Sequence, residues 1–87
     1  MNSLRAFVNI FVESPLLDDV VQALSKVRDV ELIFEVTGEF DIVVLVSCSD
    51  IEEFRDLVKN KILKIQGVKS TVTSIVLQEH RGPSSPS

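Results

Sequence analysis

The 87-residue chain contains no tryptophan or tyrosine, only three glycines, and a single histidine and cysteine. One cysteine cannot form an intrachain disulfide, and its isolation is typical of a protein from a reducing compartment. No Cys-x-x-Cys, His-Glu-x-x-His, P-loop or Gly-x-Gly-x-x-Gly pattern occurs. The sequence therefore predicts no catalytic residues, no metal ligands and no cofactor. We interpret Cys48 as a core residue and His80 as a solvent-exposed side chain.

Positive charge is also scarce, since nine Lys and Arg face thirteen Asp and Glu, for a net charge of -4. Without a basic cluster the chain is a poor candidate for gripping a phosphate backbone, so no direct contact with nucleic acid is expected. No apolar stretch approaches the roughly 20 residues of a membrane span. The N-terminus leads directly into a strand pattern rather than a signal peptide. We expect a cytoplasmic protein without a membrane partner.

The chain does contain one pattern that occurs twice. Residues 4–36 give an apolar strand-like run, a Ser-Pro break, a helix-period segment, a short turn and another strand. Residues 40–77 repeat this order, with Ser-Asp as the break. Two strand–helix–strand units predict an α+β fold, a βαββαβ ferredoxin-like sandwich with an antiparallel four-stranded sheet. We place one domain at residues 1–80 and a disordered tail, rich in Pro and Ser, at residues 81–87.

Local signals place the ends of these elements. Ser14 is the predicted N-cap of the first helix and Pro15 its first residue, while Asp50 and Glu53 form a capping-box pattern for the second. Gly67 fits a left-handed cap after the second helix. The predicted strands are residues 5–13, 30–36, 42–48 and 70–79, and the apolar helix stripes cover residues 16–27 and 51–65.

The strands carry large apolar side chains on both faces of the predicted sheet. Val8, Ile10 and Val12 alternate with Phe7 and Phe11 in the first strand, and the other strands follow the same pattern. Helices cover only one face, so a monomer would leave a large apolar face in water. The pattern favours a sheet-to-sheet dimer, that is, a dimeric α+β barrel.

Two short motifs are candidates for binding. In Thr37-Gly38-Glu39-Phe40-Asp41 the glycine permits a positive φ and the close approach of another group, while Asp41 is suited to an ammonium group. Thr71 and Thr73, two residues apart, lie on one face of the last strand. Each motif also has an ordinary structural explanation, a plain hairpin turn and a common strand composition. The threonines can belong to a binding site only if the turn of a neighbouring molecule approaches them.

These residues also carry a family resemblance. The stretch VTGEFD at residues 36–41 resembles the Gly-x-Tyr-Asp turn of the Lrp/AsnC, or feast/famine, transcription regulators. The segment IQGVKSTVTSIVL at residues 65–77 resembles the Pro-Gly-Val, Thr-x-Thr and apolar strand of the same family. Phe40 replaces the usual Tyr and Gln66 the usual Pro. The similarity extends over residues 6–78, the effector-binding and oligomerisation domain.

The resemblance implies a specific function. Full-length members carry a helix-turn-helix domain ahead of this one, so the chain resembles a stand-alone form of the ligand-binding domain. It implies a homodimer through the sheets, further association into an octamer, and an amino-acid effector bound between dimers. Full-length regulators of the same family are then candidate partners for transcription regulation. The implied effector-binding residues are Gly38, Glu39, Phe40, Asp41, Thr71 and Thr73.

The sequence also leaves other functions to consider. A purely structural assembly module without a ligand is the main alternative. A small cofactor-free enzyme of the dimeric α+β barrel type needs a pocket lined by residues such as His, Trp or Tyr, which this chain lacks or nearly lacks. An RNA-binding domain of the RRM type needs exposed aromatic residues and a basic face. An ACT domain places a glycine in its first strand–helix turn, which here reads Glu13-Ser14-Pro15.

Overall fold

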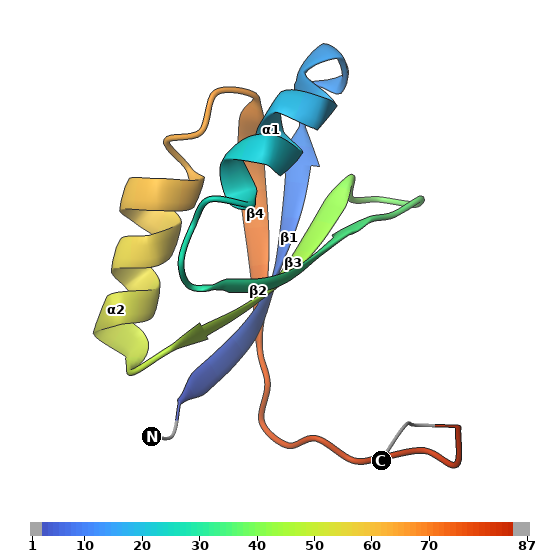
Figure 1. Ribbon diagram of the computed structural model, residues 1–87, viewed down its shortest axis with the longest axis vertical. Helices are drawn as coiled ribbons and strands as arrows, with labels where there is room; N and C mark the ends of the chain where they lie inside the picture. Colours follow the sequence, from blue (N-terminus) through green and yellow to red (C-terminus); the bar gives the residue numbers. More distant parts are fainter. Residues whose placement is uncertain (1–2, 85–87) are drawn as a thin grey trace.

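The computed structural model describes residues 3–84 and contains one four-stranded antiparallel sheet with helices on one face. The strand order is β2-β3-β1-β4, and Figure 1 shows α1 and α2 on the same side of this sheet. The predicted α+β, ferredoxin-like βαββαβ fold is therefore confirmed. The strands are β1 (Leu4–Val12), β2 (Val30–Glu35), β3 (Ile42–Cys48) and β4 (Val68–Ile75), and the helical segments are η1 (Ser14–Leu16), α1 (Leu17–Leu24), α2 (Ile51–Asp56) and η2 (Leu57–Ile62).

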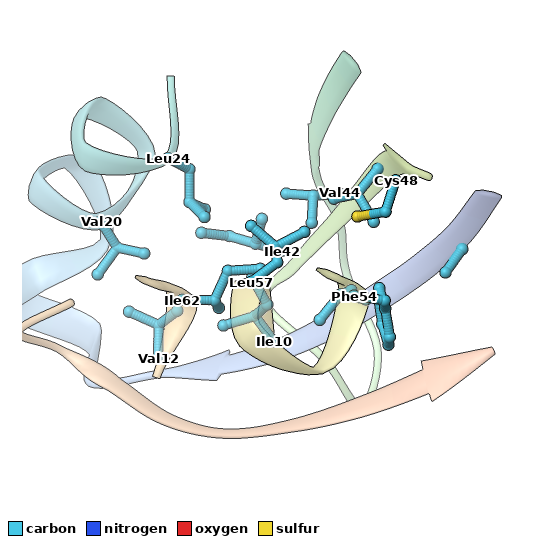
Figure 2. Close-up of a cluster of buried hydrophobic side chains, with 13 residues drawn as sticks. Ile10, Val12, Val20, Leu24, Ile42, Val44, Cys48, Phe54, Leu57 and Ile62 are labelled. Atoms are coloured by element: carbon cyan, nitrogen blue, oxygen red, sulfur yellow. The ribbon is translucent and has the colours of Figure 1, made fainter. Parts of the chain in front are cut away.

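The core lies between the helices and the inner face of the sheet (Figure 2). Four alternate residues of β1, from Ala6 to Val12, and the four inner positions of β3 are buried there, together with one face of each helix. Cys48 belongs to this cluster, as predicted. The principal members are Ala6, Val8, Ile10, Val12, Val20, Leu24, Ile42, Val44, Val46, Phe54, Leu57 and Ile62.

The first helix begins differently from the prediction. Glu13, not Ser14, is the N-cap, and no side chain caps this end. The Glu13 N–H donates to the Gly67 carbonyl at 2.8 Å, and the Glu13 carbonyl accepts from the Leu16 N–H at 2.8 Å. The second bond closes a 3₁₀ turn one residue early and the first ties its start to the Gly67 turn, so Ser14 lies inside the 3₁₀ turn. The helix also ends at Leu24, before Val27.

The second helix has the predicted Asp50 cap, but the reciprocal bond of the capping box goes to Ser49, one residue before the N-cap. The Asp50 carboxylate accepts a hydrogen bond from the Glu53 N–H at 2.8 Å, and Glu53 Oε1 accepts one from the Ser49 N–H at 2.5 Å. From Leu57 the helix widens into a π-helical segment that ends at Ile62, three residues before the end of the predicted stripe. The widening keeps Leu57 and Ile62 buried.

The last strand starts earlier and ends earlier than predicted. Gly67 does have a positive φ of 103°, but it lies in a turn closed by the Val68 N–H and the Ile65 carbonyl at 3.1 Å, not next to the helix end. The strand runs from Val68 to Ile75 instead of residues 70–79. His80 is exposed, as expected. Of the predicted tail, residues 85–87 lie outside the described range, and its disorder stays a prediction.

The outer face of the sheet carries no helix and is largely apolar. Cross-strand pairing brings Phe7 beside Leu45 in β3, and Leu45 in turn beside Leu32 in β2. Large side chains there are partly exposed, Leu32 to 51% and Phe34 to 45%. This surface, which we call the open face, agrees with the predicted alternation. Among residues 3–84, no helix has the length and apolar character required to cross a membrane.

Candidate functional site

The turn between β2 and β3 is held at both ends and open at its tip. The Val36 N–H donates to the Asp41 carbonyl at 3.0 Å, which closes a four-residue loop. Gly38 has a φ of 117°, a conformation that favours glycine, and a Cβ built there meets no atom within 4 Å. The turn therefore offers space for another molecule directly above its backbone.

Asp41 attaches this turn to β1. Its N–H donates to the Ile10 carbonyl at 3.0 Å, and its Oδ2 accepts a hydrogen bond from the Val12 N–H at 2.8 Å. Val12 lies just beyond the last β1–β3 pair, where a register shift also interrupts the β1–β4 ladder. The carboxylate thus replaces a main-chain acceptor at the end of the ladder. Asp41 is the residue predicted to bind an ammonium group. One of its two carboxylate oxygens is therefore already hydrogen-bonded within the chain.

Phe40 fixes the other side of the turn. Its ring packs on Phe11 with centroids 4.8 Å apart and planes at 50°. Such a tilted aromatic pair contributes about 0.5–1.5 kcal/mol beyond the area that it buries. Phe11 points to the open face, so Phe40 folds back over that face. Glu39, between the fixed residues and Gly38, remains exposed.

The threonine pair lies on the other side of β1. Thr71 is opposite Ile10 and Thr73 is opposite Val8, so both hydroxyls share the helix-covered face with those residues. This agrees with the prediction that the two side chains lie on one face. β4 is an edge strand, and Thr71 is half-buried while Thr73 is exposed. The pair can therefore contact a molecule that approaches the β4 edge.

The structure does not bring the two motifs together within one chain. β1 lies between them: the Asp41 N–H donates to the Ile10 carbonyl from one side and Thr71 pairs with Ile10 from the other, while Phe40 lies on the opposite sheet face from the threonines. A single site made of Gly38, Glu39, Phe40, Asp41, Thr71 and Thr73, drawn from two copies of the chain, stays a prediction.

Sequence reasoning missed a cavity on the open face. It has a volume of about 390 Å³ and lies between the sheet and the segment that follows β4. In its wall Arg5 forms an ion pair with Glu79 at 2.9 Å, and Arg5 also pairs at 3.5 Å with Glu31, which does not line the cavity. No local pattern signals these contacts, because Arg5 and Glu79 are 74 residues apart. The other lining residues are Phe7, Leu45, Val76, Gln78 and His80.

Comparison with known proteins matches this arrangement to one family. The family model described as the Lrp/AsnC ligand binding domain matches residues 5–84. An uncharacterised HTH-type transcriptional regulator of Pyrococcus horikoshii is 37% identical over 71 residues, which cover 82% of this chain and 45% of the regulator. The chain thus spans about half the length of the curated regulators that it matches.

Solved structures agree with the sequence relatives. A protein from Thermus thermophilus superimposes with a TM-score of 0.84 and 30% identity, covering 91% of this chain and 99% of that one. A transcriptional regulator from Neisseria meningitidis, solved as an L-Met complex, gives a TM-score of 0.85 and 27% identity, covering 95% of this chain and 56% of that one.

One relative belongs to another class of protein. A homocitrate synthase from Sulfurisphaera tokodaii is 32% identical over 78 residues, which cover 88% of this chain but only 17% of the enzyme. The similarity therefore extends over most of this chain and a small part of that protein. The family model, the regulators and the solved structures together establish that the chain belongs to the Lrp/AsnC ligand binding domain family.

Proposed function

We propose that this chain is an effector-binding and oligomerisation domain that senses a small effector, an amino acid, between dimers. Gly38, Glu39, Phe40 and Asp41 come from one dimer and Thr71 and Thr73 from another. The observation that carries the proposal is the open space above Gly38, in a turn that the Asp41 hydrogen bonds anchor to β1. A ligand that needs both motifs binds only an assembly that joins them.

The chemistry of the turn suits the main-chain groups of an amino acid. Within residues 3–84, the N–H groups of Gly38, Glu39 and Phe40 donate to no other protein group and are available to a carboxylate. The Thr71 and Thr73 hydroxyls both donate and accept, which suits an ammonium or carboxylate group. The L-Met complex of the Neisseria regulator supports an amino-acid effector. The side-chain class of the effector does not follow from these groups.

In this arrangement, a change in the assembly state of the protein would report that the effector has bound. The open face is apolar and lacks a covering helix, which supports a sheet-to-sheet homodimer. An effector seated between dimers stabilises whichever assembly contains the intact site. We infer that the dimers associate further into octamers. We also infer that longer regulators of the family are partners of this chain in the cytoplasm. The proposed role of the chain is binding rather than catalysis.

A thermal-shift screen against the twenty amino acids tests the proposal. A ligand at about 1,000 times its Kd adds roughly 4 kcal/mol per site, which raises the Tm of a small domain by several degrees. We expect one or a few amino acids to raise the Tm. No shift with any of them, in a protein that still forms dimers, would favour the structural assembly module instead.

The Gly38→Val variant identifies the site. A valine side chain fills the open space above the turn, and we expect it to abolish the thermal shift. Because no neighbouring atom lies within 4 Å of the new Cβ, the fold and the dimer should persist despite local strain at this φ. Unchanged ligand affinity in this variant would remove the turn from the site.

A further inference from the structure

A second cavity, of about 460 Å³, lies at the other end of β3 from the Gly38 turn. It is formed where β3 leads into α2, and its wall includes Asp29 from the segment before β2 and Glu53 from α2. Three hydroxyl groups, from Ser3, Ser47 and Ser49, also line it. All of these groups come from one chain, so the cavity needs no partner copy to be complete.

Asp29 is the residue that distinguishes this cavity from an ordinary surface depression. Its side chain is only 10% exposed, and its main-chain carbonyl accepts a hydrogen bond from the Ser47 N–H at 3.0 Å. The Asp29 carboxylate accepts no hydrogen bond from any group in residues 3–84. Its ionic neighbour is Arg28, whose Nε lies 3.8 Å from Oδ1, beyond hydrogen-bonding distance.

Arg28 offsets the negative charge of the Asp29 carboxylate only weakly. The Arg28 side chain is 86% exposed, and an exposed ion pair of this length contributes little. The Asp29 oxygens are not sealed in the interior: among residues 3–84 no fully buried side-chain oxygen lacks a hydrogen-bond partner, so those of Asp29 stay accessible from the cavity. A ligand that brings an N–H donor into the cavity can therefore reach them.

Glu53 adds a second carboxylate to the same wall. Its Oε1 accepts the Ser49 N–H, which holds the side chain in place and leaves Oε2 free of that bond. Burial, followed by the nearby charge of Asp29, raises the pKa of the Cys48 thiol to about 11, and Glu53 acts in the same direction. The two carboxylates outnumber the single guanidinium of Arg28, so the lining favours a cation.

The geometry points to a binding site for a small primary ammonium compound, formed by Asp29 and Glu53 with the serine hydroxyls around them. A primary ammonium has three N–H donors, and carboxylate and hydroxyl oxygens are its natural acceptors. A metal ion is a poorer fit, because residues 3–84 contain no group of three or more His, Cys, Asp or Glu arranged to hold one. The volume lies within the range of small-molecule sites, about 300–1,000 Å³.

Titration of the ¹⁵N-labelled protein with n-propylammonium chloride, followed by amide chemical shifts, tests this site. We expect saturable shifts at Asp29, Ser47, Cys48 and Ser49, and no comparable response to tetramethylammonium chloride at equal ionic strength. Tetramethylammonium carries the same charge but no N–H donor, so it separates hydrogen bonding from general attraction. Shifts that rise linearly without saturation, or that are equal for both cations, would overturn the proposal.

Isosteric variants assign the effect to the two carboxylates. Asp29→Asn and Glu53→Gln keep the size of each side chain, and Gln retains an acceptor for the Ser49 N–H. We expect each to weaken propylammonium binding about tenfold or more, since hydrogen bonds to charged groups exceed those to neutral ones. Asp19→Asn, at an exposed acid on α1, is the matched control and should leave affinity unchanged.

These variants also separate this site from the proposed effector site. An Asp29→Asn protein with an unchanged Tm without ligand and undiminished propylammonium binding would overturn the assignment. The Gly38→Val variant should bind propylammonium normally, since that turn lies at the other end of β3. Failure of the effector screen would leave this titration unaffected, and the reverse is also true.

Discussion

Asp41 shows how a single side chain in the turn can serve the fold and the site at once. Its Oδ2 accepts the Val12 N–H at 2.8 Å, where the β1–β3 ladder has ended. Within residues 3–84 Gly38 and Glu39 make no such bond, so Asp41, together with the Phe40 ring packed on Phe11, holds the turn against β1. An effector that reaches this turn therefore meets a backbone already fixed in position.

Replacing Asp41 by Ala should lower the free energy of unfolding by about 1–3 kcal/mol, because the partly buried Val12 N–H loses its acceptor. Asp41→Asn keeps an acceptor oxygen and should cost less. Glu39→Ala, at an exposed neighbour in the same turn, is the control and should change stability little. Urea denaturation measures all three, and equal stability of the Ala and Asn variants would contradict the role given to this hydrogen bond.

At the scale of elements, the two turns that contain positive-φ glycines differ in their surroundings. Gly38 has open space around its missing Cβ, whereas a Cβ at Gly67 would lie 2.8 Å from Leu16 Cβ and 2.8 Å from Val20 Cγ2. The Gly67 turn therefore packs directly against the first helix. Its carbonyl also accepts the Glu13 N–H, which ties this turn to the end of β1.

Gly67→Ala should therefore destabilise the protein more than Gly38→Ala. Both variants place a side chain at a positive φ, which costs about 1–3 kcal/mol. Only at Gly67 must the neighbouring helix also move to relieve a contact below 3.0 Å. Thermal unfolding of the two variants compares the costs under identical conditions. Equal Tm values would show that the crowding at Leu16 and Val20 relaxes without penalty.

The elements that the sequence predicts best are those with local boundary signals. The run from Ile42 to Cys48 has the predicted ends, because a turn precedes it and the Asp50 cap follows it. Ser14 was assigned wrongly because a tertiary bond from Glu13 to Gly67 sets the start of the helix. The end of β4 was also wrong, since apolar residues continue past Ile75 although the strand does not.

The candidate sites likewise differ in whether local sequence signals reveal them. Gly38 and Asp41 are recognisable from turn chemistry, and Thr71 and Thr73 from strand alternation, because these are local features. The cavity beside Asp29 depends on the contact between Asp29 and Ser47, which are far apart in the sequence. Local patterns contain no information about such a contact, so this cavity could not be predicted.

At the scale of the whole molecule, the two faces of the sheet have opposite environments. The helix-covered face forms a dry core, while the open face leaves Phe7, Leu32, Phe34 and Val72 partly in water. Exposed apolar residues are common singly, but a set that extends from β2 to β4 on one face is characteristic of an interaction surface. A second copy offers the same apolar surface in return, which satisfies the self-complementarity of a two-fold dimer.

Leu32→Glu tests this association against a matched control. Leu32 on the open face and Ile51 at the start of α2 are each 51% exposed, so Leu32→Glu and Ile51→Glu remove similar exposed residues and add the same charge. In a sheet-to-sheet dimer the charge at position 32 would be buried without a partner, at a cost of several kcal/mol per copy. Sedimentation velocity should then show a monomer for Leu32→Glu and the parental assembly for Ile51→Glu, with folded far-UV circular dichroism for both. If Leu32→Glu retains the parental assembly, the open face is not the dimer interface. If Ile51→Glu alone dissociates, the helices form it instead.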